Sequence, residues 1–223
     1  MGQSDKRDMH YSHQRGEGGL STEAGKVAER IVAEGPGRAF TAADFADIAS
    51  AGNAGNILGR MYARGELARA IRGVCCVPDK SELLGTEVSA SVDEVVRAVP
   101  RANKRVVTPA GDAALNSLGL DTQVPARHIY VSSGPYKTYS YGPYTIELRQ
   151  RANRDLFDRP PVTRIVVQAF KTRGRNGASY EAVSALARNL ADEDADTLLE
   201  ESKGLTSWTA EGAKRIWRER HDG

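Results

Sequence analysis

The sequence predicts an α+β fold, with helices toward both ends of the chain and short strands between them. Apolar residues recur at helical spacing over residues 21–65, over 92–99 and again from residue 161 onward. Between these segments, residues 67–77 and 127–150 alternate in polarity and turn at glycines, which is typical of short antiparallel strands.

Composition places the chain among ordinary globular proteins. Of its 223 residues, 40% are hydrophobic and 27% are charged, and this length allows two small domains. No apolar run approaches the roughly 20 residues that a membrane helix needs, and the first residues lack the apolar stretch of a signal peptide. We therefore expect a cytoplasmic protein, without membrane contact, whose thiols stay reduced.

Residues 1–20 are polar and rich in glycine, without periodicity, and we expect them to form a disordered tail. His10 and His13 lie in this tail with no further ligand nearby. Since zinc normally needs three or four protein ligands, the sequence predicts no metal site there.

Two helices open the folded part of the chain. Ser21 or Thr22 is the candidate N-cap of the first, which a Gly-Pro-Gly stop at residues 35–37 ends. Thr41 is the candidate N-cap of a second, shorter helix. Their expected buried faces are Ala24, Val27, Ala28 and Ile31 in the first helix and Ala42, Phe45, Ala46 and Ile48 in the second.

A third helix is expected to end near Gly65, although its sequence holds more glycine than a helix usually tolerates. Its apolar residues follow the helical spacing i, i+3, i+4 and i+7: Ala54, Ile57, Leu58 and Met61. Two apolar runs, Leu67–Ile71 and Val74–Val77, then flank an Arg-Gly corner at Arg72, which predicts a hairpin.

This order of elements predicts a winged helix-turn-helix over residues 21–80, followed by a mixed α/β domain that ends in a helical segment. On the third helix, asparagines and arginines lie mainly opposite the apolar face. Asparagine pairs with adenine edges, and arginine with guanine or phosphate, so this face and the basic hairpin indicate double-stranded DNA as a partner. The candidate DNA-binding residues are Thr41, Asn53, Asn56, Arg60, Arg64, Arg69 and Arg72. A small helical domain with a solvated polar face is the alternative.

Charge is unevenly distributed, although the formal net charge is only +2. Residues 101–175 hold 13 Lys or Arg against 5 Asp or Glu, whereas residues 176–204 hold 2 against 7. A polyanionic partner of the basic segment and pairing between the two segments within the chain explain this equally well.

The second domain is expected over residues 81–223, with a mixed α/β part at 81–158 and a helical part at 159–223. Residues 127–150 predict three antiparallel strands and contain five of the eight tyrosines, for which packing between strands is favoured over stacking on bases. The Gly-x-x-Gly at residues 174–177 predicts a turn between helices with a glycine C-cap. The acidic run Asp192, Glu193, Asp194 and Asp196 predicts a solvated linker.

No catalytic motif is present in the sequence. It lacks a Walker loop, a dinucleotide-binding fingerprint, H-E-x-x-H and G-x-S-x-G. His128 starts a strand, where packing or exposure is favoured over catalysis. We therefore expect neither an enzyme nor a cofactor.

Both cysteines lie in "AIRGVCCVP", residues 70–78, which could be a metal half-site, a redox switch or neither. Alternation along a strand places Cys75 and Cys76 on opposite faces, a poor geometry for joint ligation. The thiols are therefore expected to be packing residues, and Arg72 at the corner is the informative residue of this stretch.

Two blocks of the sequence resemble the AbiEi family, the antitoxins of type IV toxin-antitoxin systems. The first, "GRAFTAADFADIASAGNAGNILGRMYARGELARAIRGV", resembles the N-terminal winged helix of that family. The second, "TPAGDAALNSLGLDTQVPARHIYVSSGP", resembles a more specific block of it. The matching positions are Leu58, Arg60, Met61, Gly65, Leu67, Arg69, Arg72 and Gly73, then Gly111, Ala114, Asn116, Leu118, Gly119, Leu120, Thr122, Gln123, Val124 and Pro125. Cys75 stands where the family usually has an aromatic residue.

The resemblance implies an antitoxin of an abortive infection (phage defence) system. Such a protein also represses transcription of its own operon by binding inverted repeats in the promoter, as a monomer in solution that can act cooperatively on DNA. It counteracts a nucleotidyltransferase toxin without a stable complex, and residues 81–223 would be its antitoxin domain. The alternative is an RNA-binding or protein-interaction module that neutralises a toxin by direct contact.

Overall fold

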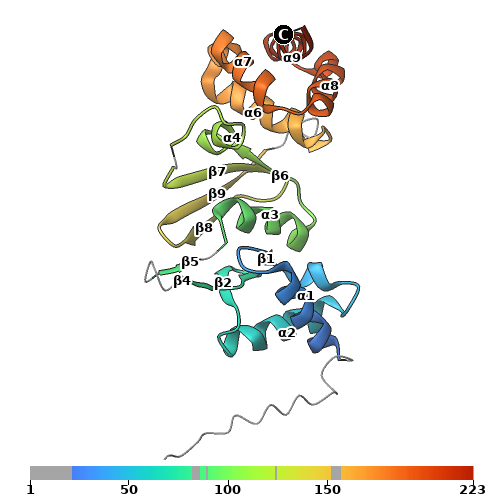
Figure 1. Ribbon diagram of the computed structural model, residues 1–223, viewed down its shortest axis with the longest axis vertical. Helices are drawn as coiled ribbons and strands as arrows, with labels where there is room; N and C mark the ends of the chain where they lie inside the picture. Colours follow the sequence, from blue (N-terminus) through green and yellow to red (C-terminus); the bar gives the residue numbers. More distant parts are fainter. Residues whose placement is uncertain (1–21, 82–85, 89, 124, 152–156, 223) are drawn as a thin grey trace, which may run out of the picture.

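The computed structural model describes residues 22–81, 86–88, 90–123, 125–151 and 157–222. The described part is elongated and has three layers stacked along its long axis (Figure 1). We call them the N-terminal unit (residues 22–78), the middle layer (90–151) and the helical layer (157–222). The α+β class is confirmed, because helices form both ends and sheets lie between them.

The N-terminal unit contains the expected helices. In α1 (Glu23–Glu34) the Thr22 hydroxyl accepts a hydrogen bond from the Gly25 amide, so Thr22 is the N-cap. The short second helix is the 3₁₀ helix η1 (Ala42–Phe45), and α2 (Ala51–Ala63) is the third. The expected apolar face of α2 is confirmed: these helices share a core of Val27, Ile31, Phe40, Phe45, Ala54, Ile57, Leu58 and Met61.

A three-stranded sheet completes this unit, with β1 (Ala39–Phe40), β2 (Ala68–Ile71) and β3 (Val74–Cys76) in the order β1-β3-β2. The predicted hairpin is β2–β3, and Ile71 pairs with Val74 across its corner. Gly73 has φ 83°, a conformation that glycine adopts without strain. Strand β1 was not predicted. A two-stranded ribbon, β4 (Asp79–Ser81) and β5 (Thr86–Val88), follows.

The middle layer is a four-stranded sheet with α3 (Val92–Asn103) on one face. Its strands stand in the order β6-β7-β9-β8, and a short helix, α4, follows β6. The bounds are β6 (Val107–Ala110), α4 (Asp112–Ser117), β7 (Arg127–Ser132), β8 (Lys137–Tyr141) and β9 (Tyr144–Gln150).

The prediction of three antiparallel strands over residues 127–150 was partly wrong. Strands β8 and β9 form an antiparallel hairpin, but β7 pairs with β9 in parallel. The tight turn at Gly142 specifies the hairpin locally, whereas nothing local specifies how the more distant β7 joins it.

The tyrosines of this region mostly pack, as predicted. Tyr130 is buried, and Tyr139, Tyr141 and Tyr144 pack partly buried against the core shared with α3, whereas Tyr136 is exposed. His128 is also buried and lies edge-on to the Tyr144 ring.

The helical layer is formed by α6 (Pro161–Arg173), α7 (Tyr180–Asn189), α8 (Asp192–Glu201) and α9 (Ser207–Asp222), with 3₁₀ turns η2 (Gly174–Ala178) and η3 (Ser202–Gly204) between them. Gly174 caps α6 with φ 69°, as predicted. The acidic run, however, is not a linker. It starts α8, because acids in a first turn favour the helix dipole and the buried Leu198 anchors the helix.

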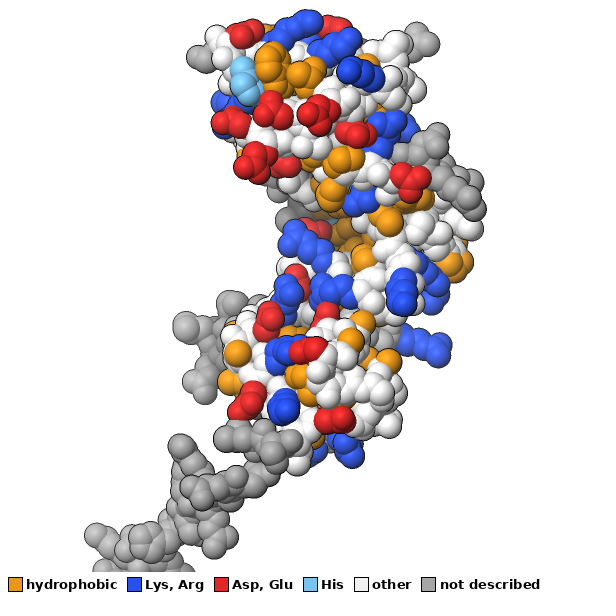
Figure 2. All heavy atoms as spheres, turned by 90° about the vertical axis from the view of Figure 1, so that its right-hand side faces the viewer, with side chains coloured by type: hydrophobic (Ala, Val, Ile, Leu, Met, Phe, Trp, Pro, Cys, Tyr) orange, Lys and Arg blue, Asp and Glu red, His pale blue; other side chains and the backbone are white. Residues whose placement is uncertain are grey.

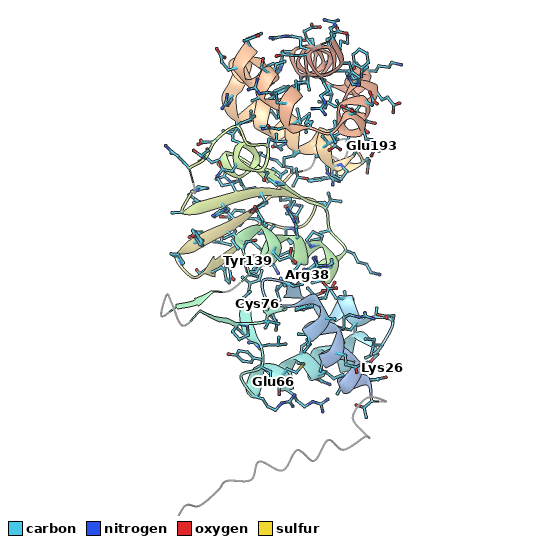
Figure 3. The ribbon with its side chains drawn as sticks, in the orientation of Figure 1. Lys26, Arg38, Glu66, Cys76, Tyr139 and Glu193 are labelled. Atoms are coloured by element: carbon cyan, nitrogen blue, oxygen red, sulfur yellow. The ribbon has the colours of Figure 1, made fainter. Side chains whose placement is uncertain are left out.

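Buried cores cross the predicted domain boundary at residue 80 and the predicted division of the second domain at residue 158. One cluster joins Cys76 of the N-terminal unit to Val95 of α3 and Leu148 of β9, and Figure 3 shows Cys76 and Tyr139 at this junction. A second cluster joins Leu115 of α4 to the helical layer. Residues 80 and 158 are therefore not points at which the packing separates.

Candidate nucleic-acid interface

The exposed face of α2 lies opposite its buried face, where the sequence predicted it. At 100° per residue, the direction opposite the buried face points between Gly52, Asn56, Gly59 and Ala63, all of which are exposed. Arg60 is also exposed and lies at one side of this group of residues. We call these five residues the α2 outer face.

Glycines leave the α2 outer face, and the position of Gly55 at its edge, without protruding side chains. A Cβ atom built on Gly52, Gly55 or Gly59 meets no other atom within 4 Å. Nothing inside the protein therefore requires glycine there, although each glycine in a helix costs about 0.5–1 kcal/mol relative to alanine. A surface without side chains at these points lets the backbone of another molecule approach the helix closely.

Three of the predicted residues are exposed and have no side-chain partner among the described residues. Asn56 and Arg60 on α2 and Arg72 at the tip of the β2–β3 hairpin make no side-chain hydrogen bond or ion pair with any residue that the structure describes. Their amide and guanidinium groups are therefore available to bases or phosphates without breaking a contact inside the protein.

Arg69 and Arg64 are exposed but already have partners. The Arg69 guanidinium lies 4.7 Å from the centre of the Tyr62 ring, an arrangement that holds the side chain against the end of α2. Arg64 donates to Glu66 at 3.1 Å, and this pairing lowers the pKa of the Glu66 carboxyl. Figure 3 shows Glu66 at the lower end of the molecule, so this acid reduces the positive charge near α2.

Thr41 and Asn53 are not available as predicted. Thr41 is fully buried, and its hydroxyl and backbone amide both donate to the Asp44 carboxylate, at 3.1 and 2.7 Å. It is the N-cap of η1, and in this position its hydroxyl is neither exposed nor free of a partner. Asn53 is half-buried and donates its amide to Glu23 of α1.

The cysteines follow the predicted alternation. Cys76 is buried in the core shared with α3, whereas Cys75 is half-buried and packs on the other side. Burial raises the pKa of the Cys75 thiol, which makes a reactive thiolate unfavourable. Within the described ranges, no three His, Cys, Asp or Glu side chains are grouped so that they could hold a metal ion.

The glycines are the part of this surface that sequence reasoning missed. Their spacing, i, i+3 and i+7 from Gly52, places them on the polar side of a helix whose other face was already assigned. This spacing is visible in the sequence, although glycine in a helix is first of all a sign of low helix propensity.

The fold and this surface define the class: an α+β protein whose N-terminal unit exposes a glycine-rich helix face with Asn56 and Arg60, and an arginine at the tip of a hairpin. The model of DUF6088, a family of unknown function, matches residues 26–198, and the chain belongs to that family. No curated protein and no solved structure matches the chain. Among the described residues, no helix is long and apolar enough to span a membrane.

Proposed function

We propose that the N-terminal unit is a winged helix-turn-helix that binds double-stranded DNA, and that the protein represses the operon that encodes it. In this proposal α2 is the recognition helix and the β2–β3 hairpin is the wing. The observation that carries it is the α2 outer face, where glycines leave room for a sugar-phosphate backbone beside the uncommitted Asn56 and Arg60.

The three groups have distinct expected roles. Asn56, near the centre of the α2 outer face, is placed to read an adenine edge in the major groove. Arg60, at the side of that face, is placed to reach a guanine or a phosphate. Arg72 extends from the tip of the wing toward the neighbouring backbone or minor groove.

An antitoxin role toward a nucleotidyltransferase toxin is the second half of the proposal, and the support for it is the resemblance of the two sequence blocks to the AbiEi family. The second block includes α4 and β7. This block therefore lies in the middle layer, away from α2 (Figure 1). DNA binding and toxin neutralisation would then use different layers of the molecule.

The DNA half is tested by titrating the full chain into a labelled duplex of its own upstream region, at several salt concentrations, with fluorescence anisotropy. We expect Arg60→Gln and Arg72→Gln each to weaken binding by about 1–3 kcal/mol if a base contact is lost, or to lower the salt slope by about one if a phosphate contact is lost.

Arg188→Gln is the matched control, because Arg188 is an exposed arginine of α7 in the helical layer. It should bind the duplex as the wild type does. Unchanged affinity and salt slope in both the Arg60 and Arg72 variants would contradict the proposal. The antitoxin half is tested separately, by growth of cells that express the neighbouring toxin gene with and without this protein.

A further inference from the structure

A cleft of about 570 Å³ lies where the middle layer meets the helical layer. Its walls are α3 and β6 on one side and α6 with the start of α8 on the other. Figure 2 faces this side of the molecule and shows apolar side chains in a hollow below a row of acidic residues. The apolar lining of the cleft includes Val96 of α3 and Val162 and Ile165 of α6. The size and the lining are those of a site for a small molecule.

Arg164 is a positive charge in this cleft that has no carboxylate partner among the residues the structure describes. Its Nη1 donates to the Phe157 carbonyl at 3.1 Å, and its Nε is buried without a hydrogen-bond partner among the described residues. Burial lowers the pKa of this guanidinium, and no acid counteracts that effect. The guanidinium is half-buried and has one carbonyl as its acceptor within the described ranges, so an anion that reaches it would stabilise it.

The two acids that line the cleft are exposed to water, whereas Arg164 is half-buried. Asp93 and Asp194 are exposed at the rim, and Asp93 accepts the Tyr130 hydroxyl at 2.7 Å. Arg97, exposed beside Asp93 on α3, is in no ion pair with the part of the chain that the structure describes. Thr108 is buried in the wall of the cleft, and its Oγ1 has no hydrogen-bond partner among the described residues. Both acids are thus screened by water, whereas the buried charge is positive.

We propose that this cleft binds a small organic anion with an apolar body. Its carboxylate or sulfonate pairs with the Arg164 guanidinium, and its body packs between Val96 of α3 and Val162 and Ile165 of α6. This binding site is separate from the α2 outer face, so its occupancy is measured without DNA.

The test uses 8-anilinonaphthalene-1-sulfonate, an apolar anion that fluoresces when it leaves water, titrated into the full folded chain. We expect one saturable site. Arg164→Gln should weaken binding about tenfold or more, the loss expected for a charge-assisted hydrogen bond, whereas Arg164→Lys should retain part of it. Val162→Trp should abolish binding by filling the cleft.

Lys171→Gln is the matched control. Lys171 lies two turns further along α6 and lines a different hollow, with Arg149 and Arg151. It should bind as the wild type does, and N-phenyl-1-naphthylamine, the uncharged analogue, should bind the wild type about tenfold more weakly. Circular dichroism and the urea midpoint verify that each variant is folded. Binding that depends on Lys171 and not on Arg164, or that is equal for the uncharged analogue, overturns the proposal.

Discussion

Arg101 of α3 lies 2.7 Å from the Asp44 carboxylate and donates to the Ala39 carbonyl at 2.7 Å. One side chain of the middle layer thus holds two points of the N-terminal unit. Asp44 in turn accepts both hydrogen bonds of the η1 N-cap, so the contact reaches from α3 to the start of η1.

Arg101→Met should lower the free energy of unfolding by about 1–3 kcal/mol, because it leaves the partly buried Asp44 carboxylate without its counter-charge and the Ala39 carbonyl without its donor. Urea unfolding followed by circular dichroism measures the change. Arg64→Met is the matched control: it breaks the exposed pair with Glu66, which water screens and which is expected to contribute little to stability. Equal losses in the two variants would show that Arg101 does not link the layers.

Alanine at Gly52, Gly55 and Gly59 should make the protein more stable and a weaker DNA binder. Each substitution removes backbone freedom from the unfolded chain and should raise the free energy of unfolding by about 0.5–1 kcal/mol. The added methyl groups keep a DNA backbone away from α2, so the affinity for the upstream duplex should fall. Urea unfolding and anisotropy on the same preparation measure the two effects.

Ala33→Gly, at an exposed position of α1 outside the α2 outer face, is the reverse control: it should lower stability and leave DNA affinity unchanged. If the triple alanine variant gains stability and still binds the duplex as the wild type does, the glycines serve no DNA contact and α2 is not the recognition helix.

His128 should make the protein less stable as the solution becomes acidic. Burial lowers the pKa of His128 below its usual value of about 6.5, and its Nε2 has no hydrogen-bond partner in the described part of the chain. As pH falls below about 6.5, the unfolded chain binds a proton that the folded chain does not, so the free energy of unfolding decreases until the folded-state pKa is reached.

His128→Phe should flatten this dependence, measured by urea unfolding at several pH values between about 5 and 8. His221→Gln removes an exposed histidine of α9 and should leave the dependence in place. If the free energy of unfolding of His128→Phe still decreases as the pH falls, another titratable group causes the pH dependence.

The local part of the fold could be predicted from the sequence. The buried face of α2 and the β2–β3 corner depend on spacings within about ten residues, and both were found. The two-residue β1 and the parallel pairing of β7 with β9 could not be predicted, because strands far apart in the chain form them and no turn signal specifies the partner. The helix α8 was missed because its acids were interpreted as solvated charge, although acids also favour a first helical turn.

The candidate nucleic-acid interface could likewise be predicted only where it depends on local spacing. Helical spacing correctly placed Asn56 and Arg60 on the outside of α2. It could not show that Glu23, thirty residues earlier, binds the Asn53 amide, or that Thr41 is enclosed by its own cap. The cleft around Arg164 was not predicted, because its walls come from separate segments that meet only in the folded chain.

The core that joins Cys76, Val95 and Leu148 has a practical consequence for dividing the molecule. A fragment that stops at residue 80 would expose the face of β2 and β3 that packs on α3, and would lose both Arg101 contacts. A fragment intended for crystals with DNA should therefore extend through β9. For the same reason, recombination between related genes could exchange the N-terminal unit intact only if it carried α3 and its sheet along.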